Sequence, residues 1–377
     1  MPFFGHPPHV FPYFGHRNAN RLTITARALR AREPSWDHQS DLAKIRALWS
    51  QFASKEHPRL PVSLVIGAPD GSEWRHEGVT NDEGFVRFDI EIDGWGLPAT
   101  TAWETVRFEW YNARGAQSAE GYVLAPGTDA KLGVISDIDD TIIETGITGG
   151  ISNVARNWRR LLATMPSDRT KVPGAGKLYG NLAGAIADPS ADRDKPGTRR
   201  IATQRPFFYV SSSPWNLFHY LVAFMESRSL PIGPIHLRDW GFNRATLGSS
   251  GHGLHKRMAA TALLEAYPHM RFALIGDDTQ GDLIAFSEIA MENPGRVAAI
   301  FIRMNGEPHT PEELAAKAHI EDANIPLWLG DSFDVGADFL DRIGVSPVGD
   351  TAQIVETIEE EGPAAGPSDL AQSAQDA

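Results

Sequence analysis

Short apolar runs alternate with longer segments of helical spacing over the C-terminal part of this 377-residue chain. The five runs are Leu132–Ile135, Phe207–Val210, Ile232–Leu237, Phe272–Ile275 and Val297–Ile302. Runs of this length are typical of buried strands, and helices between them allow the strands to pair in parallel. We therefore expect an α/β domain with a Rossmann-like parallel sheet over residues 126–345.

The preceding part of the chain has a strand-like pattern of its own. Alternating or β-branched segments occur at Leu22–Ala26, Val62–Ile66, Phe85–Ile90 and Thr105–Trp110. They predict a small antiparallel β-sandwich over residues 20–125, crossed by one helix at about Leu42–Phe52. We expect residues 1–19, rich in aromatic residues, proline, glycine and histidine, to be irregular. The acidic segment 346–377 is expected to be disordered.

Composition excludes several classes of function. The chain has no cysteine, so disulfides, thiolate metal sites and a cysteine nucleophile are ruled out. Its formal net charge of −13 argues against nucleic acid as a partner. It shows neither a secretory signal nor an apolar run of the roughly 18 residues that span a bilayer. We expect a cytoplasmic protein.

Acidic, hydroxyl and basic side chains follow the apolar runs. In open α/β sheets, ligands bind at the carboxyl ends of the strands, which is where these residues would gather. The candidates are Asp137, Asp139 and Thr141 after the first run, Ser211-Ser212-Ser213-Pro214 after the second, Asp277, Asp278 and Asp282 after Ile275, and Lys256 at the head of a helical segment.

Phosphoryl transfer needs this combination of residues. An anionic nucleophile can approach a phosphate only when Mg²⁺ and an ammonium group absorb the charge. Magnesium prefers oxygen ligands, which Asp137 and the acids after Ile275 would supply. Ser211 can donate a hydrogen bond to a phosphoryl oxygen. Ser213-Pro214 resembles a helix cap, and a helix that starts there would direct free N–H groups at an anion.

Each candidate also has a simpler interpretation. Asp139 or Asp140 alone could cap a turn, Ser211–Ser213 could only cap a helix, and Lys256 could be a solvated surface residue. Gly276-Asp277-Asp278 could be a simple turn. The joint interpretation is favoured because four independent signals each follow the appropriate element.

These motifs resemble those of the haloacid dehalogenase superfamily, and more narrowly those of the fungal actin-patch phosphatidate phosphatase family and its bacterial relatives. The matching segments are Val134–Ile142, Phe208–Trp215, Leu274–Asp277 with Gln280 and Asp282, and the landmarks Val172-Pro173-Gly174 and Pro12-Tyr13-Phe14-Gly15. The likeness covers most of residues 12–340.

The resemblance implies a haloacid dehalogenase-type sheet and a Mg²⁺-dependent phosphomonoesterase that acts through an aspartyl-phosphate. It implies Asp137 as nucleophile and metal ligand, and Asp139 as general acid and base whose backbone carbonyl also binds the metal. Thr141 would buttress the loop, and Ser211 with Lys256 would hold the phosphoryl group. Asp277 would complete the metal site, with Asp282 or Asp278 in support.

The fourth motif departs from the family pattern. It reads Asp277-Asp278-Thr279-Gln280, whereas family members usually have Ser-Gly before the glutamine. The division of metal binding among Asp277, Asp278 and Asp282 therefore stays open. Three consecutive serines also leave Ser213 as an alternative to Ser211 for phosphate binding.

The segment between the first two motifs is basic. Residues 142–205 contain eleven Lys or Arg and five acids, a net charge of +6 inside a chain of −13. As an insertion over the active site, it would attract an anionic substrate or an anionic membrane surface. The alternative is an ordinary solvated helix surface with a basic loop at 193–205.

Three functions follow from these observations. We predict a phosphatidate phosphatase that yields diacylglycerol and phosphate and touches membranes peripherally. The second is a phosphatase for a soluble phosphomonoester, such as a sugar phosphate or nucleotide. The third is a binding module with a vestigial site, which the intact Asp137, Asp139, Lys256 and Asp277 argue against.

Overall fold

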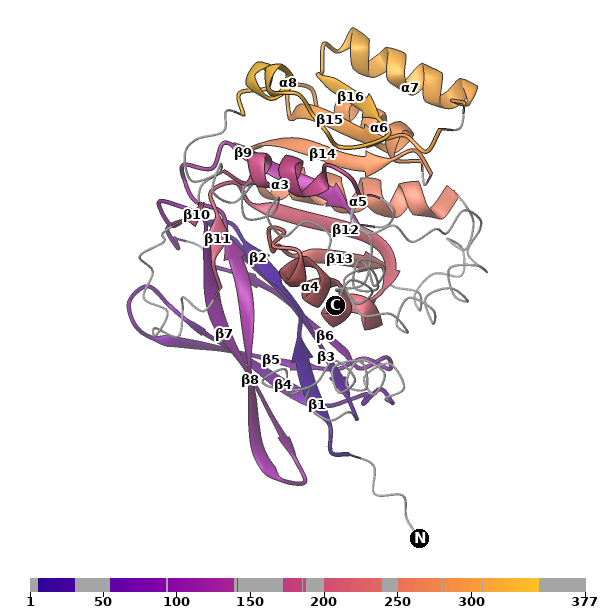
Figure 1. Ribbon diagram of the computed structural model, residues 1–377. Coiled ribbons are helices and arrows are strands. Elements are labelled where there is room, and N and C mark those ends of the chain that lie inside the picture. The colour runs from indigo at the N-terminus through magenta and orange to yellow at the C-terminus, as the bar shows by residue number, and fades with distance from the viewer. Residues whose placement is uncertain are drawn as a thin grey trace, which may run out of the picture.

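The computed structural model consists of an N-terminal sheet that adjoins a C-terminal α/β unit (Figure 1). Both classes of sheet expected from the sequence are present. The described residues are 6–30, 55–92, 94–138, 141, 172–184, 186–187, 200–238, 250–279, 281–306 and 308–345.

The α/β unit is built on a six-stranded sheet in the order β13-β12-β9-β14-β15-β16. All of its strand pairs are parallel, as the alternating pattern predicts. The bounds are β9 Leu132–Asp137, β12 Phe207–Pro214, β13 Ile235–Arg238, β14 Arg271–Asp277, β15 Val297–Arg303 and β16 Leu327–Gly330. The edge strand β16 was not expected from the sequence.

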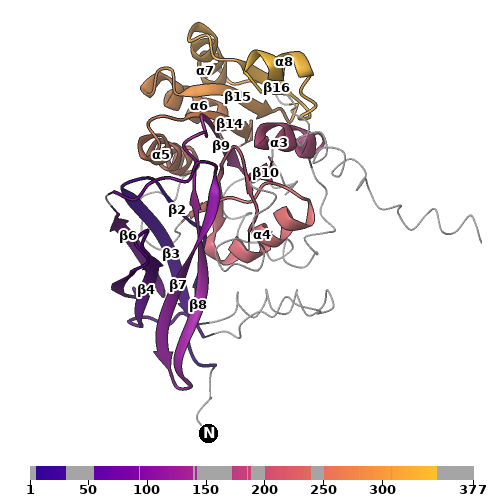
Figure 2. The same cartoon turned by 90° about the vertical axis from the view of Figure 1, so that its left-hand side faces the viewer.

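Helices cover both faces of this sheet. One apolar cluster joins the sheet to α3, α4 and α8, and a second joins its other face to α5, α6 and α7. Figure 2 shows α3 and α5 on opposite sides of β9 and β14. The bounds are α3 Ala175–Ala183, α4 Phe218–Ser227, α5 Ser250–Ala266, α6 Asp282–Glu292, α7 Pro311–Asp322 and α8 Ala337–Arg342. The finer assignment to the haloacid dehalogenase type stays a prediction.

The N-terminal sheet has eight strands joined in one hydrogen-bonded path, β1-β3-β2-β8-β7-β4-β5, with β6 on β3. Its pairs are antiparallel except β2 with β8. The bounds are β1 His9–Pro12, β2 Gly15–Arg17, β3 Arg21–Leu29, β4 Pro61–Gly67, β5 Glu73–Val79, β6 Phe85–Glu91, β7 Ala102–Asn112 and β8 Gly115–Ala125. The expected antiparallel strands are therefore present, but in one continuous sheet.

The prediction that residues 1–19 are irregular is wrong for β1 and β2. Both strands pair with β3, and β2 also pairs with β8. These partners satisfy the backbone of a segment whose prolines and glycines hide the strand propensity of its valine and aromatic residues. Tyr13 and Phe14, between the two strands, join the apolar clusters of the α/β unit.

Several expected segments lie outside the described residues. They are the helix at Leu42–Phe52, the acidic segment 346–377, and most of the basic segment 142–205. Among the helices that the structure describes, none has both the length and the apolar character to cross a bilayer.

Candidate active site

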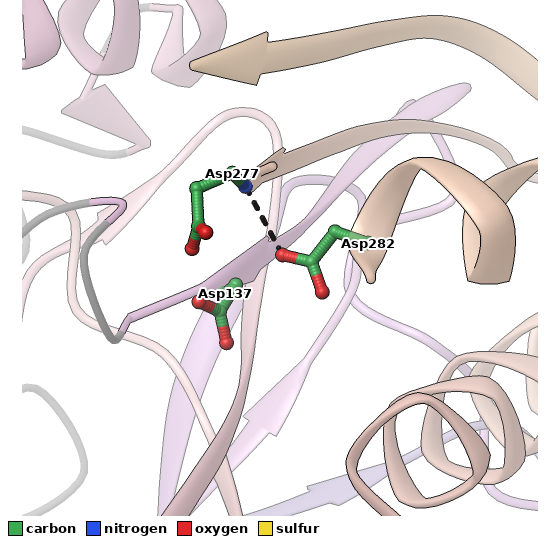
Figure 3. Close-up of side chains that lie close together, drawn as sticks. All are labelled: Asp137, Asp277 and Asp282. Carbon is green, nitrogen blue, oxygen red and sulfur yellow. Dashed lines mark hydrogen bonds between the residues drawn. The ribbon is translucent and has the colours of Figure 1, made fainter. Parts of the chain in front are cut away.

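Three aspartates meet at the carboxyl ends of two central strands (Figure 3). Asp137 ends β9, Asp277 ends β14, and Asp282 begins α6. All three are buried, and one carboxylate oxygen from each lies within 4.8 Å of the others. The backbone N–H of Asp277 donates to Asp282 Oδ2 at 3.1 Å, which turns Asp282 back toward the strand end.

Lys256 reaches this group from α5. Its ammonium lies 3.1 Å from Asp137 Oδ1 and 2.5 Å from Asp282 Oδ1. The side chain is only 2% exposed, so the interpretation as a solvated surface lysine is wrong. The structure thus places a buried cation beside the aspartate that follows the first apolar run.

The electrostatics of the group favour one further cation. Burial by itself lowers the pKa of Lys256, but the charges of Asp137, Asp282 and Asp277 outweigh this cost and hold that pKa above its ordinary value. Burial, followed by the charge of Asp282, raises the pKa of Asp277 from its ordinary 3.8 to about 7. Three buried carboxylates against one ammonium form an uncompensated negative site. Because all the donors are hard oxygens, the residues fit Mg²⁺.

Two threonines orient the carboxylates. The Thr141 hydroxyl lies 3.3 Å from both Asp137 Oδ2 and Asp277 Oδ2, so it links the two strand ends. Thr279 donates its backbone N–H to Asp277 Oδ1 at 2.6 Å, and its hydroxyl donates to the same oxygen. Thr279 was not predicted, although Asp-x-Thr after a strand is the local signal of such a turn.

Asp278 does not join the group. Its carboxylate accepts hydrogen bonds from the backbone and side-chain N–H groups of Asn305, at 2.9–3.0 Å. Of the two supporting acids expected from the sequence, the geometry therefore selects Asp282 and not Asp278 as a neighbour of Asp137 and Asp277.

The serine motif lies on the neighbouring strand. Val210 is the register partner of Asp137, so Ser211 follows one residue beyond it on β12. Ser211 and Ser213 are both buried, and the Ser213 N–H donates to Ser211 Oγ at 3.0 Å. Ser211 therefore lies near the carboxyl edge of the sheet, and its hydroxyl oxygen accepts a hydrogen bond from the backbone two residues further along the same segment.

The predicted helix start at Ser213-Pro214 is wrong. A short 3-10 helix, η3 (Trp215–Leu217), follows, and Pro214 precedes it as the N-cap residue without a side-chain hydrogen bond. The α-helix α4 starts only at Phe218. The buried Ser213 continues β12 instead of capping a helix, because the strand runs on through Pro214.

Two cations of the described part of the basic segment, Arg200 and Arg205, contact other parts of the fold. Arg205 donates to the carbonyls of Asn181 and Leu182, at 3.1 and 3.4 Å, at the end of α3. Arg200 stacks on the ring of Phe14 at 4.7 Å and pairs with Glu226. These two cations stabilise the fold and do not form part of a basic surface over the site. Asp139 lies outside the described residues.

Comparison with known proteins agrees with this geometry. Residues 132–304 match a family model described as the catalytic domain of phosphatidate phosphatase APP1. The chain is 26% identical over 320 residues to phosphatidate phosphatase APP1 of Saccharomyces cerevisiae, covering 82% of this chain and 50% of that protein. It is 28% identical over 173 residues to an uncharacterized protein of Schizosaccharomyces pombe, covering 46% of this chain and 25% of that protein.

The chain therefore spans half or less of the length of these curated relatives. The predicted resemblance to the actin-patch phosphatidate phosphatase family is confirmed, and the matches support a hydrolase of the phosphatase class. The matched segment contains all four of the residues Asp137, Lys256, Asp277 and Asp282.

Proposed function

We propose that this chain is a Mg²⁺-dependent phosphatase that hydrolyses phosphatidate through an aspartyl-phosphate formed on Asp137. One observation carries the proposal: three buried aspartates and a buried lysine meet at the carboxyl edge of a parallel sheet, inside a segment that matches a phosphatidate phosphatase catalytic domain. Carboxylates and an ammonium in such a group are suited to phosphoryl transfer.

Asp137 is the proposed nucleophile. Its carboxylate attacks phosphorus, the bond from phosphorus to the glycerol oxygen breaks, and Asp139 protonates the departing alkoxide. Asp139 then takes a proton from water, which hydrolyses the aspartyl-phosphate to phosphate and free Asp137. This role of Asp139 comes from the family resemblance alone.

The other residues manage charge around this chemistry. Lys256 keeps its proton at neutral pH, since the three carboxylates raise its pKa, so a cation stays beside Asp137 throughout. Asp137, Asp277 and Asp282 would hold Mg²⁺, which when bound neutralises charge on the phosphoryl oxygens. Ser211 is proposed to donate to a phosphoryl oxygen.

The lipid substrate rests on the name of the S. cerevisiae relative, which shares 26% identity with this chain. A cytoplasmic location and peripheral contact with a membrane surface are further proposals from the sequence.

A direct assay tests this function. The purified full chain is incubated with phosphatidate in mixed micelles, and separately with soluble phosphomonoesters, in Mg²⁺ or EDTA. We expect phosphate release from phosphatidate in Mg²⁺ only, and a loss of at least about a thousandfold in Asp137→Asn. Asp322→Asn, an exposed acid at the end of α7, is the matched control and should keep full activity.

The other outcomes separate the alternatives. Release from soluble esters alone would reject the lipid substrate and keep the role of Asp137. No release from any substrate would favour a binding module. Acid quenching followed by mass spectrometry should find phosphate on the peptide that contains Asp137, and Asp139→Asn should increase its lifetime.

A further inference from the structure

A buried chain of hydroxyl groups ends on the backbone of Asp137. The Ser136 hydroxyl donates to the carbonyl of Asp137 at 2.7 Å, and the Tyr179 hydroxyl lies 2.5 Å from Ser136 Oγ. A serine hydroxyl can donate one hydrogen bond, and Ser136 donates it to the Asp137 carbonyl. Tyr179 is therefore the donor to Ser136, and the order of donation is Tyr179 to Ser136 to Asp137.

Tyr179 is firmly held in place. It is fully buried on α3, and its ring stacks on Phe207 of β12 with centroids 5.7 Å apart. Burial raises the pKa of its hydroxyl well above the ordinary value, so the group remains a donor at any physiological pH. The helix itself approaches the chain near Phe333 closely: a Cβ on Gly174, which precedes α3, would lie 2.4 Å from the Phe333 carbonyl carbon.

The Ser136 hydroxyl contacts the Asp137 carbonyl at the point where the central strand β9 ends. The pairing of β9 with β14 stops at Ser136, opposite Ile275, so β14 provides no register partner for Asp137. On its other side Asp137 pairs with Val210 of β12, so the hydrogen bond to the Asp137 carbonyl adds to this pairing in orienting the peptide that follows Asp137. This peptide sets the direction of the chain toward Asp139 and restrains the backbone from which the Asp137 carboxylate projects.

We propose that Tyr179 is a positioning residue of the active site, which acts through Ser136 to fix the backbone of Asp137. The inference deepens the proposed function and rests on it. Through these two hydrogen bonds, α3, which lies within the inserted segment 142–205, is linked to the backbone of the proposed nucleophile.

Tyr179→Phe tests this, with Tyr209→Phe as a matched control. Tyr209 is also fully buried, stacks on Phe207 at 6.0 Å, and donates its hydroxyl to a backbone oxygen, that of Pro231, at 2.6 Å. Both variants lose one buried hydrogen bond, so their urea midpoints should fall by similar amounts. Only Tyr179→Phe should lower kcat, by about tenfold to a hundredfold with little change in KM.

Ser136→Ala removes the same connection from the strand side. Its kcat should fall as in Tyr179→Phe, and the double variant should be no slower than either single variant, because both substitutions break one chain of hydrogen bonds. If Tyr179→Phe does not fold, Ser136→Ala still decides the question.

Amide hydrogen exchange provides a readout independent of phosphate release. Peptides covering residues 132–138 should exchange faster in Tyr179→Phe and Ser136→Ala than in Tyr209→Phe. Equal kcat and equal exchange in the two tyrosine variants, or additive losses in the double variant, would overturn the proposal. If the native chain releases no phosphate, the exchange experiment still tests the connection while the proposed function fails separately.

Discussion

Among the described residues, Lys256 is the cation that lies among the three aspartates, and Lys256→Met removes it. Its ammonium lies 3.1 Å from Asp137 and 2.5 Å from Asp282. At an effective dielectric constant of about 20, a pair of unit charges 3.1 Å apart attracts by about 5 kcal/mol, which desolvation partly offsets. Removing one partner of a buried pair costs about 3–5 kcal/mol of unfolding free energy. We expect a loss of that size without metal.

Urea unfolding at pH 8, in EDTA and in excess Mg²⁺, measures the effect. A ligand at about a hundred times its dissociation constant stabilises the folded state by about 2.7 kcal/mol. Mg²⁺ should raise the midpoint of Lys256→Met more than that of the native chain, since the variant has one more uncompensated charge. Phosphatase activity should fall by at least about a hundredfold, because the charge beside the nucleophile is lost.

Two further variants sharpen the experiment. Lys131→Met removes an exposed lysine whose ammonium contacts only the Thr128 carbonyl in the described chain, and should leave the midpoint unchanged. Adding Asp282→Asn to Lys256→Met removes one of the repelling carboxylates and should restore part of the lost stability in EDTA. The electrostatic reasoning fails if Lys256→Met is as stable as the native chain in EDTA, or if Asp282→Asn destabilises it further.

Two other predictions follow from the packing. A Cβ on Gly276 would lie 2.3 Å from Asp282 Oδ2, so Gly276→Ala should displace that carboxylate and lower activity by about tenfold or more, whereas Gly67→Ala, with open space around it, should be as active as the native chain. Burial lowers the pKa of His219 to about 4 and of His236 to about 3, from 6.5. Stability should therefore be fully present above pH 6.5 and fall below it, by about 2 kcal/mol per histidine at pH 5. His236→Gln should reduce that fall in urea titrations at pH 7.5 and 5.

The core of the site could be predicted because its signals are local. The strands that carry the site, β9, β12 and β14, were each visible as an apolar run, and the carboxyl ends of parallel strands converge at one edge of the sheet. The same reasoning could have separated Asp278 from Asp277. Asp277 is the last residue of β14, and extending the alternation of the strand by one residue into the turn places Asp278 on the opposite side, where it accepts hydrogen bonds from Asn305.

The parts that sequence reasoning missed depend on distant partners. The strands β1 and β2 exist because β3 and β8 pair with them, which no window of residues 1–19 reveals. The hydroxyl chain joins residues 43 positions apart in the sequence, Ser136 and Tyr179. The sequence shows only that Arg205 carries a positive charge. Its hydrogen bonds to the last carbonyls of α3 could not be predicted, because they depend on where that helix lies in the fold.

The same long-range packing makes the N-terminal sheet part of the environment of the serine motif. Tyr13 packs on Trp215 and Phe218, with ring centroids 4.7 and 4.8 Å away. Arg27 of β3 lies over the Phe85 ring at 4.5 Å and donates to the side chain of Asn216. Residues 215–218 directly follow β12, whose last residues are the serine motif.

A change in the N-terminal part of the chain therefore reaches the residues after β12 through the rings of Tyr13, Phe14 and Phe85 and through the Arg27 guanidinium. A fragment that began at residue 126 would expose the faces of Trp215 and Phe218 and leave Asn216 without the guanidinium that now contacts it. The family match begins at residue 132, yet the contacts that hold this loop begin at Tyr13. We therefore expect a fragment limited to residues 132–304 to lose part of the packing that holds the residues after the serine motif.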